Sequence, residues 1–492
     1  MILYFRESAA SRRKIFHHIL LEAAMDNKGY CHIPRTLFDC ITFLVQALPI
    51  RSVPSFIELL MGAMLTQAGF VTEAWLNINP LRTWSAYYKW LQKGKWSWVA
   101  LGVQMARLLV IYFPQSIWFI IFDDTFVYRC SKKAPGSRIH HQHGNKTNRP
   151  QYALGQCWVS MALSITTGLK HSAVPLLSRL MRTNGNSSKL DAAKTLLRVI
   201  APVFAGQRVI TLVDCWYMKW PLLKYVLELG FNAIGQVRKD TALYDIPAFT
   251  GQRGRPRKYG EKFTADVVAA LPEIREWVYI YGKWQWVRYR SAICLAKFMA
   301  GRKVRAVWMQ FEDENGKLSK QRLILSTLSD LTAKEIFAYY ARRWSIEDLF
   351  NQMKNRWGWR EAWQQSRQVL HRWTQILSIS YALPQLLATY CFEQVQNLTQ
   401  LTPWRKQNQI TAGRIRLGLQ NILRNVRIRD WWDPKCRQFQ PPTRSQAPQD
   451  KQVGAECQLY ALSKSNLAKH SPPPAPTAGC IMKLQTSASK ST

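Results

Sequence analysis

The chain is poor in acidic residues. Its 492 residues include 30 Asp and Glu but 68 Lys and Arg, which gives a formal net charge of +38. A field of this sign attracts polyanions and makes their binding strongly dependent on salt. The composition therefore predicts a nucleic acid or an anionic surface as the partner, and by itself it does not separate DNA, RNA and a membrane surface.

Long hydrophobic runs and paired cysteines are also missing. The longest apolar stretch, around Leu108 to Phe122, is interrupted by Pro114, Gln115 and Ser116, so we expect no membrane-spanning helix. The 10 cysteines form no C-x-x-C pair, and we interpret them as reduced thiols of a cytosolic protein. The N-terminal sequence lacks the order of regions that a signal peptide has, which also favours a cytoplasmic location.

One long helix is predicted in the C-terminal third. Thr332 followed by Glu335 forms a capping box, in which each side chain bonds a backbone N–H at the helix start. Neither Pro nor Gly interrupts the sequence from Thr332 until Gly358. Apolar residues recur at helical spacings along this stretch.

Four polar residues share one face of that expected helix. At about 100° per residue, Tyr340, Arg343, Glu347 and Lys354 fall within a stripe of roughly 60°. One interpretation is a solvated face with an ion pair between neighbouring turns. The other is a helix that lies along a phosphate backbone and holds a metal ion at its middle.

Two buried strands are predicted to end in aspartates. The apolar run Ile117 to Phe122 is followed by Asp123 and Asp124, and the β-branched run Val209 to Val213 is followed by Asp214. An acid at the end of a buried strand lies at the rim of the sheet, where α/β folds bind ligands. Each aspartate taken alone is also explained as the cap of a turn.

The spacing of the four helix residues resembles the signature of the bacterial insertion-sequence transposases of the DDE superfamily that carry a Tyr-Arg-Glu-Lys motif. The resemblance implies that Asp124, Asp214 and Glu347 bind catalytic Mg²⁺, for which Mn²⁺ is a substitute. The family pattern places Asp before Thr, so we choose Asp124 over Asp123. Tyr340, Arg343 and Lys354 would then contact phosphates at the cleaved DNA end. Trp216 departs from the family, which often has a small residue two places after the second aspartate.

The fold expected from this resemblance is α/β. It would be an RNase H-like mixed sheet with flanking helices, interrupted by an inserted β-rich domain. The gap between Asp214 and Glu347 is too long for a simple connection, which is why we place the insertion there. The expected divisions are a helical N-terminal domain (1–110), the core in two parts (111–240 and 331–400), the insertion (241–330), a basic helical segment (401–433) and a disordered tail (434–492). The N-terminal domain would either bind the transposon end or buttress the core.

Aromatic residues of the insertion are candidates for stacking on a base flipped out of the duplex. The resemblance points to Trp277, Trp284 and Trp286, where stacking would contribute about 1–3 kcal/mol. Their alternative explanation is ordinary cross-strand packing.

A basic segment lies at the entry to the insertion. Arg253, Arg255, Arg257 and Lys258 surround Gly and Pro in a pattern that is similar to the core of an AT-hook, an extended segment that enters the minor groove. A solvated linker is the alternative.

A histidine cluster lies earlier in the chain. We interpret His140, His141 and His143 as part of a basic loop beside DNA, because no cysteine pair at zinc-finger spacing accompanies them.

The function expected from the resemblance is cut-and-paste DNA transposition. The partner is double-stranded DNA, both transposon ends and target, in a bacterial, nucleoid-associated setting. Because two ends must be brought together, we expect a homodimer in the DNA complex. The alternatives are an RNase H-like nuclease or resolvase that does not join strands, and an inactive DNA-binding descendant of a transposase.

Overall fold

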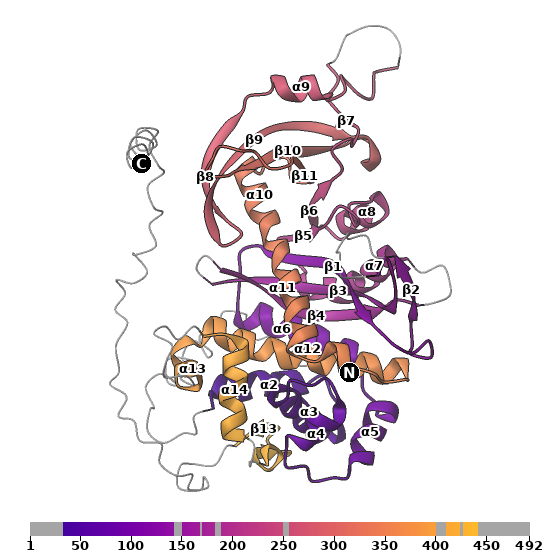
Figure 1. Ribbon diagram of the computed structural model, residues 1–492, viewed down its shortest axis with the longest axis vertical. Helices are drawn as coiled ribbons and strands as arrows, with labels where there is room; N and C mark the ends of the chain where they lie inside the picture. The colour runs from indigo at the N-terminus through magenta and orange to yellow at the C-terminus, as the bar shows by residue number, and fades with distance from the viewer. Residues whose placement is uncertain are drawn as a thin grey trace, which may run out of the picture.

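A computed structural model describes residues 33–141, 150–167, 170–182, 188–248, 255–399, 410–423 and 427–440. A large mixed sheet runs through the middle of the molecule, with helices on both of its faces and a helical layer at one end (Figure 1). No helix among these residues is long and apolar enough to cross a membrane. The mixed α/β architecture agrees with the expected RNase H-like fold.

The core of the sheet has the strand order β4-β3-β1-β5-β6. Strand β1 is antiparallel to β3 and parallel to β5, and β5 is parallel to β6. The short strand β2 continues the edge of β3 beyond β4. The bounds are β1 Trp118–Tyr128, β2 Ser137–His141, β3 Tyr152–Thr167, β4 Lys170–Leu180, β5 Val209–Val213 and β6 Asn232–Val237.

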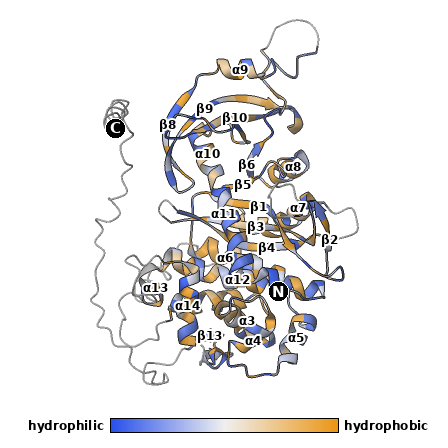
Figure 2. Cartoon of the chain, viewed as in Figure 1, coloured by the Kyte–Doolittle hydropathy of each residue, from blue (hydrophilic) through white to orange (hydrophobic). Residues whose placement is uncertain are grey.

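The two central strands are buried because helices cover both of their faces. All residues of β5 are buried, as are the first five of β1, which is the pattern expected of apolar runs inside a sheet. Hydrophobic residues follow the same strands and the helices packed on them (Figure 2). One face carries α10 (Ala333–Ala341) and α11 (Ser345–Asn355), and the other carries α7 (Lys189–Ile200), followed by η2 (Ala201–Phe204). Helix α8 (Trp220–Glu228) connects β5 to β6.

The β-rich insertion extends the core sheet. Its strand β11 pairs antiparallel with β6, and β10, β9 and β7 follow in the same sheet, with β8 paired to β9. The strands of the insertion therefore belong to the same sheet as the core strands. Whether the insertion is a domain of its own stays a prediction. The bounds are β7 Leu243–Tyr244, α9 Ala265–Ala270, β8 Ile274–Ile280, β9 Lys283–Ala296, η3 Lys297–Met299, β10 Arg302–Glu312 and β11 Arg322–Ser326.

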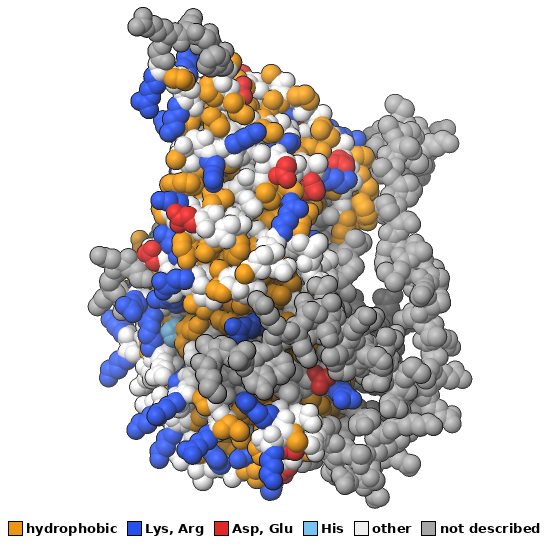
Figure 3. Space-filling model, turned by 180° about the vertical axis from the view of Figure 1, so that it is seen from behind, with side chains coloured by type: hydrophobic (Ala, Val, Ile, Leu, Met, Phe, Trp, Pro, Cys, Tyr) orange, Lys and Arg blue, Asp and Glu red, His pale blue; other side chains and the backbone are white. Residues whose placement is uncertain are grey.

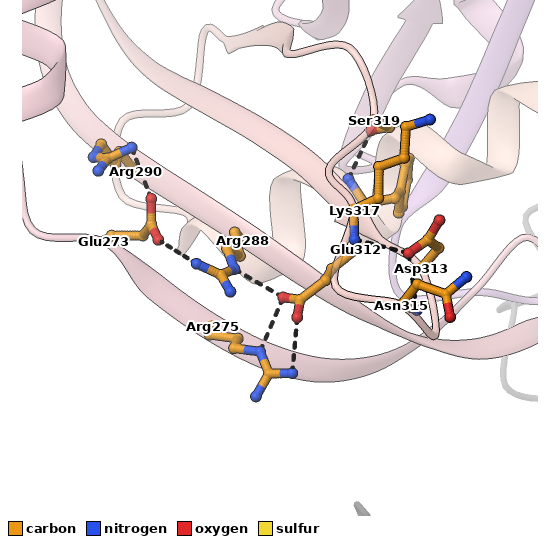
Figure 4. A network of polar contacts seen from close by, with 10 residues as sticks. Glu273, Arg275, Arg288, Arg290, Glu312, Asp313, Asn315, Lys317 and Ser319 are labelled. Carbon is orange, nitrogen blue, oxygen red and sulfur yellow. Dashed lines mark hydrogen bonds and ion pairs between the residues drawn. The ribbon is translucent and has the colours of Figure 1, made fainter. Parts of the chain in front are cut away.

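An ion-pair network joins the strands of the insertion (Figure 4). Glu312, 8% exposed, accepts hydrogen bonds from Arg275 of β8 and from Arg288 of β9. Hydrogen bonds from these two guanidinium groups lower the pKa of Glu312 to about 2, although burial alone would raise it. Glu273 extends the network to Arg288 and Arg290.

The N-terminal helices pack against helix α12 (Arg367–Tyr390). Arg372 of α12 donates to the carbonyl oxygens of Leu91, Gly94 and Trp96. Gly69 lies so close to Gly358 that a Cβ on either residue would overlap the other's backbone. The bounds are α2 Arg35–Val45, η1 Ile50–Ser52, α3 Val53–Leu65, α4 Val71–Leu76, α5 Trp84–Lys93 and α6 Trp98–Tyr112. These contacts suit a buttress for the core, while binding of a transposon end stays a prediction.

The C-terminal part begins with α13 (Phe392–Thr399) and α14 (Ala412–Leu423). Next come η6 (Ile428–Trp431) and the pair β12 (Trp432–Asp433) and β13 (Gln438–Phe439). Phe439 packs against Phe38, with 4.9 Å between ring centroids, so residues 434–440 have structure, contrary to the expected tail. The remainder of that expected tail lies outside the described residues.

Candidate active site

Three acidic residues from distant parts of the chain lie around Arg343, beside the middle of β1. Phe122 and Val213 are paired in the parallel ladder of β1 and β5, so the next residues, Asp123 and Asp214, lie side by side. Glu347 lies in the first turn of α11, on the face of β1 toward which Asp123 points. The topology therefore brings together the middle of β1, the end of β5 and the start of α11. The expectation that the first strand ends at the aspartates is wrong, because β1 continues through them to Tyr128.

Arg343 joins two of these acids directly. Its Nη1 lies 3.0 Å from Oδ2 of Asp123, and its Nη2 lies 2.7 Å from Oε1 of Glu347. The Arg343 side chain is 12% exposed and that of Asp123 is 16% exposed, so this charge-assisted pair is shielded from water. Burial would lower the pKa of Arg343, but Tyr340 and the two acids raise it above its usual range.

The acids raise one another's pKa. Burial raises the pKa of Asp123 to about 7, and the neighbouring Asp214 and Asp124 add to the rise while Arg343 opposes it. Burial also raises the pKa of Asp214, against hydrogen bonds from the backbone N–H of Tyr217 and of Trp216. Crowded carboxylates of this kind favour an added positive charge.

The two adjacent aspartates differ in which face of the sheet they point to. The acid that Arg343 joins to Glu347 is Asp123, whereas Asp124 was expected. Successive residues of a strand point to opposite faces of the sheet. Asp124 therefore points away from α11, and on the opposite face it pairs with Lys189 of α7. Its carboxylate also accepts a hydrogen bond from the Tyr217 hydroxyl.

The expected single helix is two helices. Residues Arg342–Trp344 form a 3₁₀ turn, η4, between α10 and α11, so the calculated 60° stripe does not apply. The predicted capping box is present, with Thr332 and Glu335 bonded to each other's backbone N–H. A 3₁₀ turn has about 3.0 residues per turn where an α-helix has about 3.6, so it shifts the angular positions of the residues that follow.

Tyr340 precedes Glu347 along the chain and Lys354 follows it. Tyr340 is 4% exposed, and burial raises its pKa to about 12. Lys354 Nζ donates to Oγ1 of Thr125 at 2.8 Å, next to Asp124 on β1. Helix α11 therefore lies along β1 from Asp123 to Thr125, and the phosphate contacts expected of Tyr340 and Lys354 stay predictions.

The tryptophans proposed to stack on a base make contacts within the insertion. Trp277 and Trp286 are cross-strand neighbours with 5.1 Å between their ring centroids. The guanidinium carbon of Arg275 lies 4.0 Å from the Trp286 ring centroid. Trp284 packs against Tyr279. These contacts are what ordinary cross-strand packing predicts, and base stacking stays a prediction.

A different pair of aromatic residues lies beside the acids, and the sequence analysis missed it. Tyr281, at the tip of the β8–β9 hairpin, has a φ of 55° and lies 6.1 Å from the ring of Trp344. Trp344 is 55% exposed and directly follows Arg343. The sequence signals a turn here only by Gly282, which follows Tyr281, and only the fold shows that this hairpin reaches Trp344 of η4.

The expected basic segments lie apart from the acids. Arg255, Arg257 and Lys258 are exposed and lie near α9 at the far end of the insertion (Figure 1), while Arg253 is outside the described residues. Their contact with DNA stays a prediction.

The histidines differ from the expected basic loop. His140 and His141 belong to strand β2, and His143 is outside the described residues. Burial lowers the pKa of His140 to about 4, so it is neutral near pH 7.

Trp216 forms an exposed platform next to Asp214. The ammonium groups of Lys189 and Lys219 lie 4.8 Å and 4.2 Å from the centroid of its ring. Lysine and arginine also predominate over acids on the back of the molecule, most densely over its lower part (Figure 3). Both features suit a polyanionic partner.

The donor chemistry fits a hard divalent cation, although the acids do not enclose one. Among the described residues, no three His, Cys, Asp or Glu side chains are close enough together to hold a metal ion. Asp123, Asp214 and Glu347 nevertheless supply the carboxylate oxygens that Mg²⁺ prefers. Arg343 stands between two of them and supplies positive charge there.

Comparisons with known proteins identify the family. No curated protein matches the chain. Among solved structures, the NurA nuclease from Sulfolobus solfataricus is similar over 47% of this chain and 73% of that one, with 9% sequence identity. The TM-score is 0.21, so this likeness carries no argument about fold or function. A family model described as the transposase DDE domain matches residues 114–383, which include Asp123, Asp214 and Glu347. Because this match covers more than half of the sequence, the chain belongs to the family of transposases with a DDE domain.

Proposed function

We propose that this chain is a cut-and-paste DNA transposase of the Tyr-Arg-Glu-Lys subgroup. It would cleave the DNA at the ends of an insertion sequence and join the freed 3′ hydroxyl to target DNA. The observation that carries this proposal is the Arg343 bridge between Asp123 and Glu347, beside Asp214. Family membership implies DNA as the substrate, and the basic composition agrees.

Asp123, Asp214 and Glu347 would hold the metal ions. When bound, Mg²⁺ would make a water or hydroxyl nucleophilic and stabilise the leaving oxygen. This proposal substitutes Asp123 for the Asp124 of the sequence analysis, because Asp123 shares a face of the sheet with Glu347. Arg343 would give up its contact with the acids and bind a phosphate of the DNA end, for which its planar fork is suited.

The rest of the site would hold the DNA. Lys354, which is hydrogen-bonded to Thr125, would bind a phosphate of the DNA. Tyr340 would support Arg343, whose guanidinium group lies over the Tyr340 ring. Two DNA ends must meet for a complete reaction, so we propose a homodimer in the DNA complex. Chromosomal DNA as partner would place the protein at the bacterial nucleoid.

An end-cleavage and strand-transfer assay tests the proposal. The substrate is duplex DNA carrying the element's own termini, incubated with Mg²⁺, Mn²⁺ or EDTA. We expect nicking and strand joining with either metal, and loss of both with EDTA and in Asp123→Asn, Asp214→Asn and Glu347→Gln. Asp348→Asn is the matched control, because Asp348 is exposed beside Glu347 on α11. Cleavage without joining would identify a nuclease instead, and metal-independent binding without cleavage would identify a DNA-binding protein.

A further inference from the structure

Asp124 connects four elements on the face of the sheet opposite to Arg343. Its Oδ2 lies 2.7 Å from Lys189 Nζ of α7 and 3.7 Å from Cys157 Sγ of β3. Its Oδ1 accepts a hydrogen bond of 3.2 Å from the hydroxyl of Tyr217, in the loop after β5. An aspartate in the middle of β1 thus fixes the segment that follows the neighbouring strand β5.

Tyr217 contacts two acids with two different groups. Its side chain is fully buried and its hydroxyl donates to Asp124. Its backbone N–H donates to Oδ1 of Asp214 at 3.0 Å, and the backbone N–H of Trp216 donates to the same oxygen at 3.0 Å. The loop from Asp214 to Tyr217 is therefore held at both ends, with one oxygen of Asp214 turned into the loop.

We propose that Asp124 and Tyr217 are positioning residues that orient the Asp214 carboxylate for a divalent cation. This inference rests on the proposed function only in taking Asp214 as a metal ligand. With Oδ1 held by two N–H groups, the second oxygen of Asp214 keeps one direction. Because Asp124 anchors the Tyr217 hydroxyl, the backbone N–H of Tyr217 and that of the preceding Trp216 stay in place. Partners of this kind, one step behind a ligand, typically change metal affinity by 10- to 100-fold when removed.

The test is the Mn²⁺ affinity of the full-length protein, measured by electron paramagnetic resonance of free Mn²⁺. Tyr217→Phe removes the hydroxyl alone, so we expect affinity to fall by about 10- to 100-fold. Asp124→Asn keeps an oxygen that accepts from Tyr217, so we expect a smaller loss. Tyr225→Phe on α8 is the matched control, because no hydrogen bond of the Tyr225 hydroxyl is recorded among the described residues.

The cleavage reaction adds a second readout. In Tyr217→Phe, the Mn²⁺ concentration for half-maximal cleavage should rise by the same factor, while the rate at saturating Mn²⁺ stays near that of the unmodified protein. A merely structural role would lower the melting temperature and leave the metal dependence unchanged, which would overturn the proposal.

Two further outcomes decide the matter. If Asp124→Asn removes Mn²⁺ binding as completely as Asp123→Asn, then Asp124 is itself a ligand and the proposal is wrong. If Tyr217→Phe weakens Mn²⁺ binding as expected but the unmodified protein cleaves no DNA end, the positioning role stands and the proposed function fails.

Discussion

Replacing Arg343 with alanine should tighten Mn²⁺ binding to the DNA-free protein. The guanidinium group holds Asp123 at 3.0 Å and Glu347 at 2.7 Å, and a metal ion must compete with it for both carboxylates. The buried bond to Asp123 contributes about 1.5–3 kcal/mol, as hydrogen bonds to charged groups do. The bond to Glu347, which is 38% exposed, adds about 0.3–0.5 kcal/mol.

These two contributions set the size of the effect. Together they amount to about 1.8–3.5 kcal/mol, which corresponds to a change in affinity of roughly 20- to 300-fold. The assay is a calorimetric titration of the DNA-free protein with Mn²⁺ at pH 8. End cleavage should be lost in Arg343→Ala even though the metal binds more tightly, because no group replaces the arginine at the DNA phosphate.

The same titration has an expected pH dependence. Burial raises the pKa of Asp123 to about 7, so this carboxyl is largely protonated below pH 7 and must lose its proton to bind a metal ion. Mn²⁺ affinity of the unmodified protein should therefore rise as pH increases through about 7 and level off above it.

The neighbouring arginine supplies the control. Arg342 donates to Oγ1 of Thr166 and lies over the ring of Phe119, without a recorded contact to the acids. Arg342→Gln should leave Mn²⁺ affinity within about twofold. Unchanged or weaker Mn²⁺ binding in Arg343→Ala would refute the competition and would mean that Arg343 supports the metal site.

Three further predictions follow from charged contacts. Glu312→Gln removes the charge that Arg275 and Arg288 share, so β9 amides should exchange hydrogen about 5- to 30-fold faster, equivalent to about 1–2 kcal/mol. The pKa of Glu312 is held at about 2, so its contribution to stability is complete above about pH 4.5 and is lost as pH falls toward 2, which acid unfolding followed by near-ultraviolet circular dichroism would show. Lys354→Met breaks the contact with Thr125 and removes one phosphate contact, so the slope of log affinity against log salt for the DNA end should fall by about 1 unit.

Each of these predictions has a matched control and a contrary outcome. Glu314→Gln, in the exposed turn after β10, should leave β9 exchange unchanged, and equal effects of the two variants would exclude the network as the cause. An acid transition centred near pH 4.5 in both the unmodified protein and Glu312→Gln would exclude the lowered pKa. Lys334→Met is the control for Lys354→Met, because Lys334 lies outside the site. An identical salt slope in the unmodified protein and in both variants would show that Lys354 contacts no phosphate.

Local sequence patterns predicted several elements correctly. The apolar run before Asp214 forms β5, and the run before Asp123 forms the first half of β1, where the two strands pair in parallel. The capping box at Thr332 begins α10 where expected. These predictions succeeded because burial and capping depend on residues close together in the chain.

Predictions that depend on distant contacts were less complete. Asp123 and Asp124 are adjacent, so only the packing of α11 on one face of β1 decides which of them meets Glu347. The 3₁₀ turn before Glu347 has no marker such as Pro or Gly in the sequence. The pairing of β11 with β6, which joins the insertion to the core sheet, is likewise a long-range contact.

The most direct test of the account asks where a bound metal ion lies in the chain. Fe²⁺ takes the place of Mg²⁺ in the complex with an end-bearing duplex, and added peroxide and ascorbate then generate radicals that cut the polypeptide beside the ion. The account predicts cuts near residues 123, 214 and 347, all suppressed by excess Mg²⁺ and absent in Glu347→Gln. Cuts confined to other segments, or cuts that persist in Glu347→Gln, would contradict the assignment of Asp123, Asp214 and Glu347 to one metal site.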